Sequence, residues 1–362
     1  MNSLSSNDMP ICADQRGSTT GGGNENKQEC TSYEQKIDDY VGASCELLND
    51  MSISDNNSDE VLNICANCGK EGSDINNTCN KCKMVMYCNA ACKKKHRHKH
   101  KKDCEEHLRL AADRAAELHD EALFKQPPPQ EEDCPICFLR IPSLDSGRRY
   151  QLCCGKTICN GCFYANAKRD DNKHKQLCAF CRIPAPTSGE EALERLNKRV
   201  EAGDSEAMFN LGCKYRDGKY GCARDYGKAL ELFQRAGELG YTKSYCSIGY
   251  AYSNGRGVEV DKKKAQHYYE LAAMGGNVNA RHNLGCDEYR LGNMDRAIKH
   301  WMIAVKDGSA DSLYIIQDLY TEGKLTKDVY TAALKSYQEY LCEIKSVQRD
   351  EAATYSEDFK YY

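Results

Sequence analysis

The sequence of 362 residues lacks any long apolar run. A helix needs about 20 consecutive apolar residues to cross a bilayer, and no stretch approaches this. The first residues, MNSLSSNDMP, contain neither the basic start nor the apolar core of a secretory signal. We therefore expect an intracellular protein, cytoplasmic or nuclear, with no membrane partner.

Further absences narrow the function. The sequence has one Trp and seven Phe, and its formal net charge of −4 provides no bulk attraction for nucleic acid. It contains no paired nucleophile and base, no glycine-rich phosphate loop and no pair of catalytic carboxylates. We therefore expect no catalytic residue of its own.

Cysteine, in contrast, is abundant, with 23 residues. In a reducing compartment such cysteines are metal ligands or reactive thiols before they are disulfides. Fifteen of them fall into two clusters, at residues 65–104 and 134–181. The clusters therefore predict metal-binding fingers.

Composition divides the chain further. Residues 1–60 carry twelve acidic and three basic residues, which predicts a disordered acidic tail. A helix is expected at 105–126, followed by a proline-rich spacer at 127–133, because three consecutive prolines cannot continue a helix. The last boundaries expected are a helical repeat at 190–345 and a C-terminal tail at 346–362.

The first cluster offers eight ligand-type residues in four pairs, which suits two tetrahedral zinc ions. Their order and spacing resemble the MYND zinc finger, expected at residues 61–104. The family usually has Trp where this chain has Arg97, and His96 and His98 are nearby, so His100 is chosen for its spacing to Cys104. A thioredoxin-like redox site fits less well, because it needs one pair in a βαβ context. The resemblance implies one zinc on Cys65, Cys68, Cys88 and Cys92, and one on Cys79, Cys82, His100 and Cys104.

Seven Lys and Arg residues crowd positions 93–102. They are compatible with a nucleic-acid or nuclear-import patch, or with the solvated face of a finger helix. No aromatic residues alternate with the lysines, as single-strand binders require. We favour the solvated face and expect no nucleic-acid partner.

The second cluster also supplies eight ligands, all cysteines, and its spacing resembles a RING finger at residues 134–183. A RING normally reads Cys-Gly-His where this chain has Cys154, Gly155 and Lys156, and Cys153 is the available substitute. The resemblance implies one zinc on Cys134, Cys137, Cys159 and Cys162, and one on Cys153, Cys154, Cys178 and Cys181.

RING fingers recruit a ubiquitin-conjugating enzyme without covalent catalysis. The resemblance implies Ile136 as the apolar docking residue and Arg182 as the basic residue that holds the thioester, whereas Ala179 replaces a common proline. Each assignment has a simpler alternative, since Ile136 can pack on the zinc site and Arg182 can be a surface charge.

The repeat is visible in Gly212, Gly249 and Gly285, which recur at intervals of 37 and 36 residues, the period of a two-helix unit. The segment around Gly255 and Val258 resembles the Sel-one-like family. Its stacked hairpins present surfaces that bind other proteins.

The expected fold is thus multidomain, with two zinc-stabilised cross-brace fingers followed by an all-α helical-hairpin solenoid and four zinc ions in total. The leading hypothesis is a RING-type ubiquitin ligase whose repeats and MYND finger recruit protein targets. The alternative is a non-enzymatic adaptor for protein–protein interaction.

Overall fold

The computed structural model describes residues 63–73, 75–125, 133–143, 147–169 and 177–361. The predicted acidic tail, with Cys12, Cys30 and Cys45, lies outside these ranges, as does almost all of the predicted spacer at 127–133. The chain divides into two compact units, with the break between Ala122 and Leu123. None of the described helices combines the length and the apolar character that a bilayer crossing requires.

The first unit contains a small two-stranded ribbon. Strand β1 (Asn77–Thr78) pairs antiparallel with β2 (Met86–Tyr87). The fully buried side chains beside it are Cys65, Ile75 and Tyr87. So small a core buries too little apolar surface to hold the chain, which is the usual situation in metal-stabilised domains.

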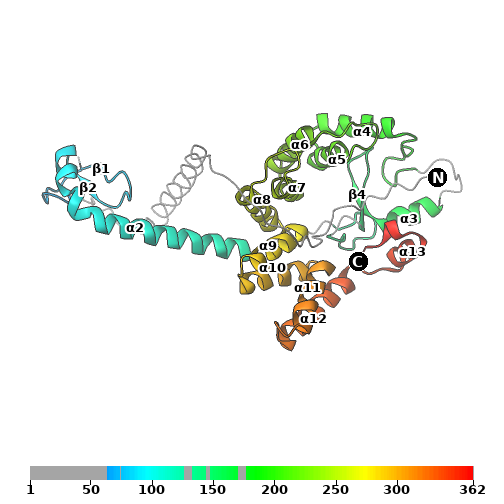
Figure 1. Ribbon diagram of the computed structural model, residues 1–362. Helices are drawn as coiled ribbons and strands as arrows, with labels where there is room; N and C mark the ends of the chain where they lie inside the picture. Colours follow the sequence, from blue (N-terminus) through cyan, green and yellow to red (C-terminus); the bar gives the residue numbers. More distant parts are fainter. Residues whose placement is uncertain (1–62, 74, 126–132, 144–146, 170–176, 362) are drawn as a thin grey trace, which may run out of the picture. The chain divides into compact units, whose positions relative to one another are not determined.

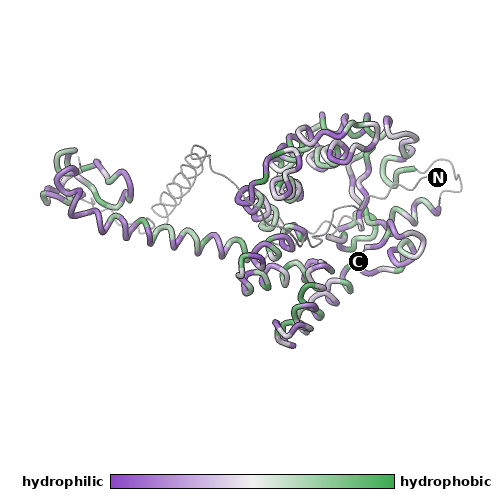
Figure 2. The backbone as a smooth tube through the Cα atoms, in the orientation of Figure 1, coloured by the Kyte–Doolittle hydropathy of each residue, from purple (hydrophilic) through white to green (hydrophobic). Residues whose placement is uncertain are grey.

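Helix α2 (Ala90–Phe124) follows β2 and runs without a break. Asn89 caps its start, because its side-chain oxygen accepts a 2.9 Å hydrogen bond from the Cys92 amide. A boundary was expected after residue 104, but the structure joins both stretches, since no glycine or proline interrupts them. Figure 2 shows that the first half of α2 is strongly hydrophilic, as its basic sequence requires.

The second unit begins with the other cysteine cluster. Strand β3 (Arg148–Tyr150) pairs antiparallel with β4 (Thr157–Cys159), and α3 (Asn160–Arg169) follows β4 directly. Its buried core is Cys134, Ile141, Ile158, Cys159 and Cys162. Three of these five residues are predicted ligands, so the core and the predicted metal site coincide.

The rest of the unit is helical, and Figure 1 shows its helices following one another as hairpins. Asp204, Asp225, Asp261 and Asn277 each precede a helix and accept a hydrogen bond from the backbone amide three residues on, so the local sequence sets these helix starts. The helices are α4 (Gly189–Glu201), α5 (Ser205–Asp217), α6 (Tyr226–Glu238), α7 (Lys243–Asn254), α8 (Lys262–Met274), α9 (Val278–Arg290), α10 (Met294–Lys306), α11 (Ala310–Thr321) and α12 (Lys327–Ile344).

The repeat glycines mark the close approach of paired helices. A Cβ atom on Gly249 would lie 2.7 Å from the Tyr269 ring, and one on Gly285 would lie 2.4 Å from the Trp301 indole nitrogen. Only glycine lets α7 meet α8, and α9 meet α10, at this separation. The expected architecture of cysteine-rich fingers followed by an all-α solenoid is confirmed.

The finger of the second unit is bonded to the solenoid at two places. Glu206 of α5 accepts hydrogen bonds from Arg148 (3.1 Å) and Thr157 (2.9 Å). The second place is near the end of the solenoid, where Asp307 and Glu343 form ion pairs with Arg140 of the finger, at 3.1 Å and 2.8 Å. The finger is therefore part of the same compact unit as the repeats.

The segment set apart as a C-terminal tail contains α13 (Val347–Tyr355) and a short 3-10 helix, η2 (Glu357–Phe359). These elements pack on α3 of the finger. The Tyr164 ring lies 5.0 Å from the Tyr355 ring and 6.1 Å from the Phe359 ring. Residues after the repeat thus return to the finger.

Candidate metal centres

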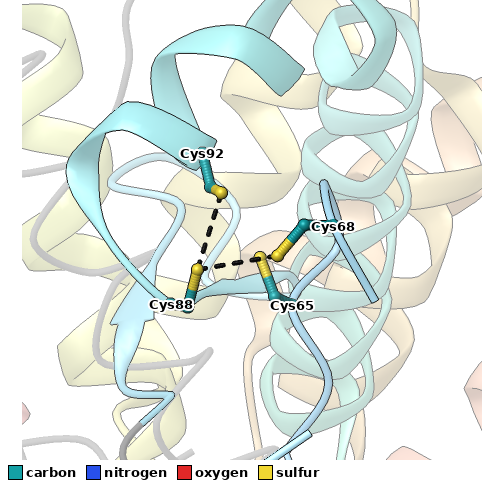
Figure 3. A group of neighbouring side chains, drawn as sticks. All are labelled: Cys65, Cys68, Cys88 and Cys92. Carbon is teal, nitrogen blue, oxygen red and sulfur yellow. Dashed lines mark hydrogen bonds between the residues drawn. The ribbon is translucent and has the colours of Figure 1, made fainter. Parts of the chain in front are cut away.

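The first group of predicted ligands joins the start of the chain's described part to α2. Cys65 and Cys68 come from a turn, Cys88 follows β2, and Cys92 lies in the first turn of α2 (Figure 3). The Cys88 Sγ atom lies 3.7 Å from that of Cys68 and 3.5 Å from that of Cys92. All four sulfur atoms lie within 4.8 Å of one another.

The second group contains the predicted histidine ligand. Cys79, Cys82, His100 and Cys104 place their ligand atoms within 4.8 Å of one another, with His100 Nε2 at 3.2 Å from Cys82 Sγ. His96 has a different partner, because its Nδ1 lies 3.2 Å from the Tyr87 hydroxyl and its ring stacks on His100. The structure therefore selects His100 from the crowded histidines.

The third and fourth groups lie in the second finger. Within each, the four sulfur atoms lie within 4.8 Å of one another. The Cys137 and Cys159 sulfurs are 3.8 Å apart, as are those of Cys154 and Cys178. The third group consists of Cys134, Cys137, Cys159 and Cys162, and the fourth of Cys153, Cys154, Cys178 and Cys181.

The same turn geometry occurs at five places in the two fingers. The residue after the second cysteine of a pair has a left-handed backbone, with φ between 57° and 72°, and its amide donates back to the carbonyl four residues earlier. Such a turn aims two side chains at one point, and three of the five positions hold a non-glycine residue in a conformation it disfavours. The positions are Gly69, Lys83, Phe138, Gly155 and Arg182.

This turn explains the irregular pair in the second finger. Gln151 donates to the Lys156 carbonyl (2.8 Å) and accepts from Gly155 (2.8 Å), which are the bonds that Cys134 makes to Leu139 and Phe138. Gln151 thus stands where the other turns have their first cysteine, and Cys154 stands at the second position. Cys153, adjacent to Cys154, supplies the fourth sulfur.

Hydrogen bonds with backbone amides and neighbouring thiols shift the pKa values of the ligand thiols in opposite directions. Backbone amides, that of Cys88 first, lower the pKa of Cys65 to about 6, whereas the hydrogen bond with Cys92 leads the causes that raise the pKa of Cys88 to about 12. Hydrogen bonds from Cys159 and Cys162 hold the pKa of Cys134 far below its usual range, and the bond with Cys134 raises that of Cys162. A divalent cation would let all four ligands of a group be deprotonated together.

The donor set of each group suits zinc. Four thiolates, or three thiolates with one imidazole, suit tetrahedral zinc, and a site closed by four protein ligands has a structural role. The remaining described cysteines belong to none of the four groups. Among them Cys246 and Cys286 are buried in the solenoid core, in agreement with a packing role.

The two predicted docking residues both lie on the turns of the second finger. Ile136 is 39% exposed, and the Arg182 side chain is exposed on a backbone with φ of 59°. The sequence interpretation missed three neighbours, since Phe138, Phe180 and Ile183 are also exposed. Their position beside the ligand pairs was the available signal.

Comparison with known proteins identifies two of the modules. Residues 65–104 match the family model of the MYND finger, and residues 205–241 and 242–277 match that of the Sel1 repeat. Both resemblances are thereby confirmed. The MYND match and the four ligand groups indicate zinc binding, while the RING assignment rests on the cysteine pattern alone.

Several curated proteins share parts of the chain. Chitin synthase regulatory factor 4 of Schizosaccharomyces pombe is 30% identical over 132 residues, 36% of this chain and 21% of that protein. The ERAD-associated E3 ubiquitin-protein ligase component HRD3B of Arabidopsis thaliana is 32% identical over 114 residues, which are 31% of this chain and 17% of that protein. The E3 ubiquitin-protein ligase DA2 of the same plant is 43% identical over 53 residues, which are 15% of this chain and 12% of that protein. The chain thus spans only 12% to 21% of these relatives' lengths.

Solved structures are also similar. A Sel1 repeat protein from Oxalobacter formigenes is 22% identical and covers 56% of this chain and 79% of its own, with a TM-score of 0.38. A protective antigen of uropathogenic Escherichia coli displaying an SLR fold is 30% identical. The match covers 45% of this chain and 35% of that protein, with a TM-score of 0.36.

Proposed function

We propose that this chain, a zinc-finger protein with a MYND finger at residues 65–104 and Sel1 repeats at 205–277, is a RING-type ubiquitin ligase. In this proposal each of the four ligand groups holds one zinc ion. The second finger docks a ubiquitin-conjugating enzyme, and the repeats and the MYND finger bind the protein to be modified. The reaction needs no nucleophile from this chain.

The exposed apolar side chains of the second finger carry the proposal. The turn at Cys134 exposes Ile136 (39%) and Phe138 (77%), and the turn at Cys178 exposes Phe180 (38%) and Ile183 (43%). Single exposed apolar residues are ordinary, but here both turns expose a pair beside a predicted zinc site. Large apolar side chains in such positions are the usual anchors of a protein interface.

Arg182 supports the same surface. Its backbone is fixed by the turn, where its amide donates to the Cys178 carbonyl at 3.2 Å. Within the described part of the chain, its guanidinium has no hydrogen-bond or ion-pair partner. A fixed backbone and a free cationic group suit contact with a bound conjugating enzyme and its ubiquitin.

The second finger must also be held firmly, and contacts with the solenoid hold it. Arg140 is bonded to Asp307 and Glu343, and Arg148 is bonded to Glu206. A recruited enzyme would therefore be held at a defined place relative to the repeats that bind the target. A ubiquitin-related function is also supported by the names of two relatives, an E3 ubiquitin-protein ligase component and an E3 ubiquitin-protein ligase.

A ubiquitin-chain formation assay with a panel of conjugating enzymes tests the proposal. We expect activity with at least one enzyme, and a loss on the order of tenfold or more for Ile136→Ala, as for an interface anchor. Val260→Ala is the matched control, because Val260 is 59% exposed between α7 and α8, outside the second finger. Absence of activity with every enzyme, or an unchanged rate for Ile136→Ala, would contradict the proposal.

The alternative function is a non-enzymatic adaptor that binds proteins through all three modules. Ala179 favours it, because active fingers commonly have proline at that position. An adaptor would bind a target through the repeats and form no ubiquitin chains. Pull-down of the same target by wild type and Ile136→Ala, with no chain formation by either, would identify it.

A further inference from the structure

Arg349 of α13 reaches into the second finger from beyond the repeats. Its side chain is 1% exposed, and all four terminal N–H groups of the guanidinium are used. Nη1 donates to the carbonyls of Arg140 (2.9 Å) and Ile344 (2.5 Å). Nη2 donates to the Leu139 carbonyl (3.3 Å) and to Cys137 Sγ (3.9 Å). One side chain thus joins the end of α12 to the loop that carries a predicted ligand.

The backbone around Arg349 is equally close to the finger. A Cβ atom on Gly161, the residue before the ligand Cys162, would lie 2.8 Å from the Arg349 amide nitrogen. Cys162 Sγ lies 3.7 Å from the Gln348 side-chain oxygen. Helix α13 therefore contacts two of the four sulfur ligands, one through Arg349 and one through Gln348.

The negative charge of a zinc site with four thiolates favours a buried arginine beside it. Four thiolates around one zinc ion have a formal net charge of about −2, and a buried charge of that kind needs a compensating partner. Arg349 donates to one of these sulfurs, that of Cys137. Arg281 is also 1% exposed, but within the described residues its guanidinium nitrogens have no hydrogen-bond partner.

We propose that Arg349 is an outer-shell positioning residue for the zinc ion held by Cys134, Cys137, Cys159 and Cys162, so that the finger keeps this ion only while α13 is docked. The finger is then completed by residues 346–361, which the sequence separates from it by the whole repeat domain. This inference depends on zinc binding by the finger, not on ligase activity.

Zinc release from the full-length protein tests the inference. Arg349→Met keeps an unbranched, apolar stem and removes the charge and the donors. We expect the affinity for one zinc ion per chain to fall about 10- to 100-fold, as for other outer-shell substitutions, and this ion to leave faster in the presence of a chelator. Arg349→Lys keeps the charge but not the fork of donors, so its rate should be intermediate. Arg281→Met is the matched control, and we expect its release rates to equal those of the wild type.

Two outcomes would overturn the inference. One is a zinc content and release rate for Arg349→Met equal to those of the wild type. The other is equal acceleration by Arg281→Met, which would show a general effect of removing a buried arginine. If Arg349→Met does not fold, Tyr361→Ala provides the test. Tyr361 is buried and its hydroxyl donates to Asp350 of α13 (2.5 Å), so the change loosens the helix while Arg349 remains. Faster loss of one zinc ion supports the inference, and unchanged loss contradicts it.

Discussion

The Tyr150 hydroxyl donates a 2.8 Å hydrogen bond to the Asp204 carboxylate. Tyr150 ends strand β3 of the second finger, and Asp204 caps the first helix of the matched repeats, where its other oxygen accepts from the Ala207 amide (3.0 Å). Arg199 also donates to Asp204, at 2.6 Å. One carboxylate therefore serves the helix cap, an ion pair and the contact between finger and solenoid.

The first prediction concerns this shared carboxylate. Tyr150→Phe should lower the free energy of unfolding by about 1.5–3 kcal/mol, because it removes a partly buried hydrogen bond to a charged group. Asp204→Asn keeps a capping side chain but not the charge. In a double-mutant cycle followed by urea unfolding, we expect a coupling energy of about 0.5–3 kcal/mol.

Tyr314→Phe is the control for the loss of a hydroxyl, since Tyr314 is 66% exposed. Its effect should stay within about 0.5 kcal/mol. Strict additivity of Tyr150→Phe and Asp204→Asn would contradict a direct contact between finger and solenoid.

A second prediction concerns the repeat glycines. Gly249→Ala should destabilise the solenoid by about 1–3 kcal/mol, because the new methyl group would lie 2.7 Å from the Tyr269 ring and 3.1 Å from the Ala265 carbonyl oxygen. Gly227→Ala in α6 is the matched control. Its Cβ atom would meet only Asp225 Oδ1 at 3.4 Å, so the same change should stabilise by about 0.4–1 kcal/mol. Thermal unfolding compares the two, and equal effects would contradict the packing role.

A third prediction concerns the strained turn of the first finger. Lys83 has a φ of 58°, a conformation that costs a residue with a side chain about 1–2 kcal/mol and glycine almost nothing. Lys83→Gly should therefore raise stability by up to about 1 kcal/mol after the entropic cost of glycine. Lys81→Gly, at a position without positive φ, should lose about 0.5–1 kcal/mol. Chelator-driven unfolding compares the two variants, and an equal loss of stability in both would show that the turn stores no strain.

A fourth prediction concerns His282 in α9. Its Nδ1 lies 2.9 Å from the Ser312 hydroxyl, and burial lowers its pKa. The folded protein thus favours the neutral ring, and this contribution to stability is complete above the unfolded pKa of about 6.5 and is lost as the pH falls through the folded value. NMR titration of the ring should give a pKa below about 6.5, and His282→Gln should remove this part of the pH dependence. A ring that titrates above about 6.5 would contradict the buried setting.

The ligand groups could be predicted from the sequence because a metal-binding turn is local. Pairs such as Cys134 and Cys137 need only a three-residue spacing to face one point, and the structure gathers the sixteen predicted residues in the four expected groups. Ligation itself stays a prediction. The helix starts were equally local, since Asp or Asn at the cap position sets them.

The contacts that join the modules could not be predicted in this way. Arg349 and Cys137 are 212 residues apart, and Tyr150 and Asp204 are 54 apart. No periodicity or spacing connects such positions, because tertiary packing brings them together. The residues after 346 therefore had no visible role in the sequence, although the structure packs them on the finger.

Native mass spectrometry of the full-length protein tests the central claim most directly. The account predicts four zinc ions per chain, and three after Cys153→Ser, because Cys153 supplies the fourth sulfur of a group whose turn has Gln151 in place of a cysteine. Cys342→Ser, at an exposed cysteine outside the four groups, should leave the count at four. Two or fewer ions in the wild type would contradict one of the two finger assignments.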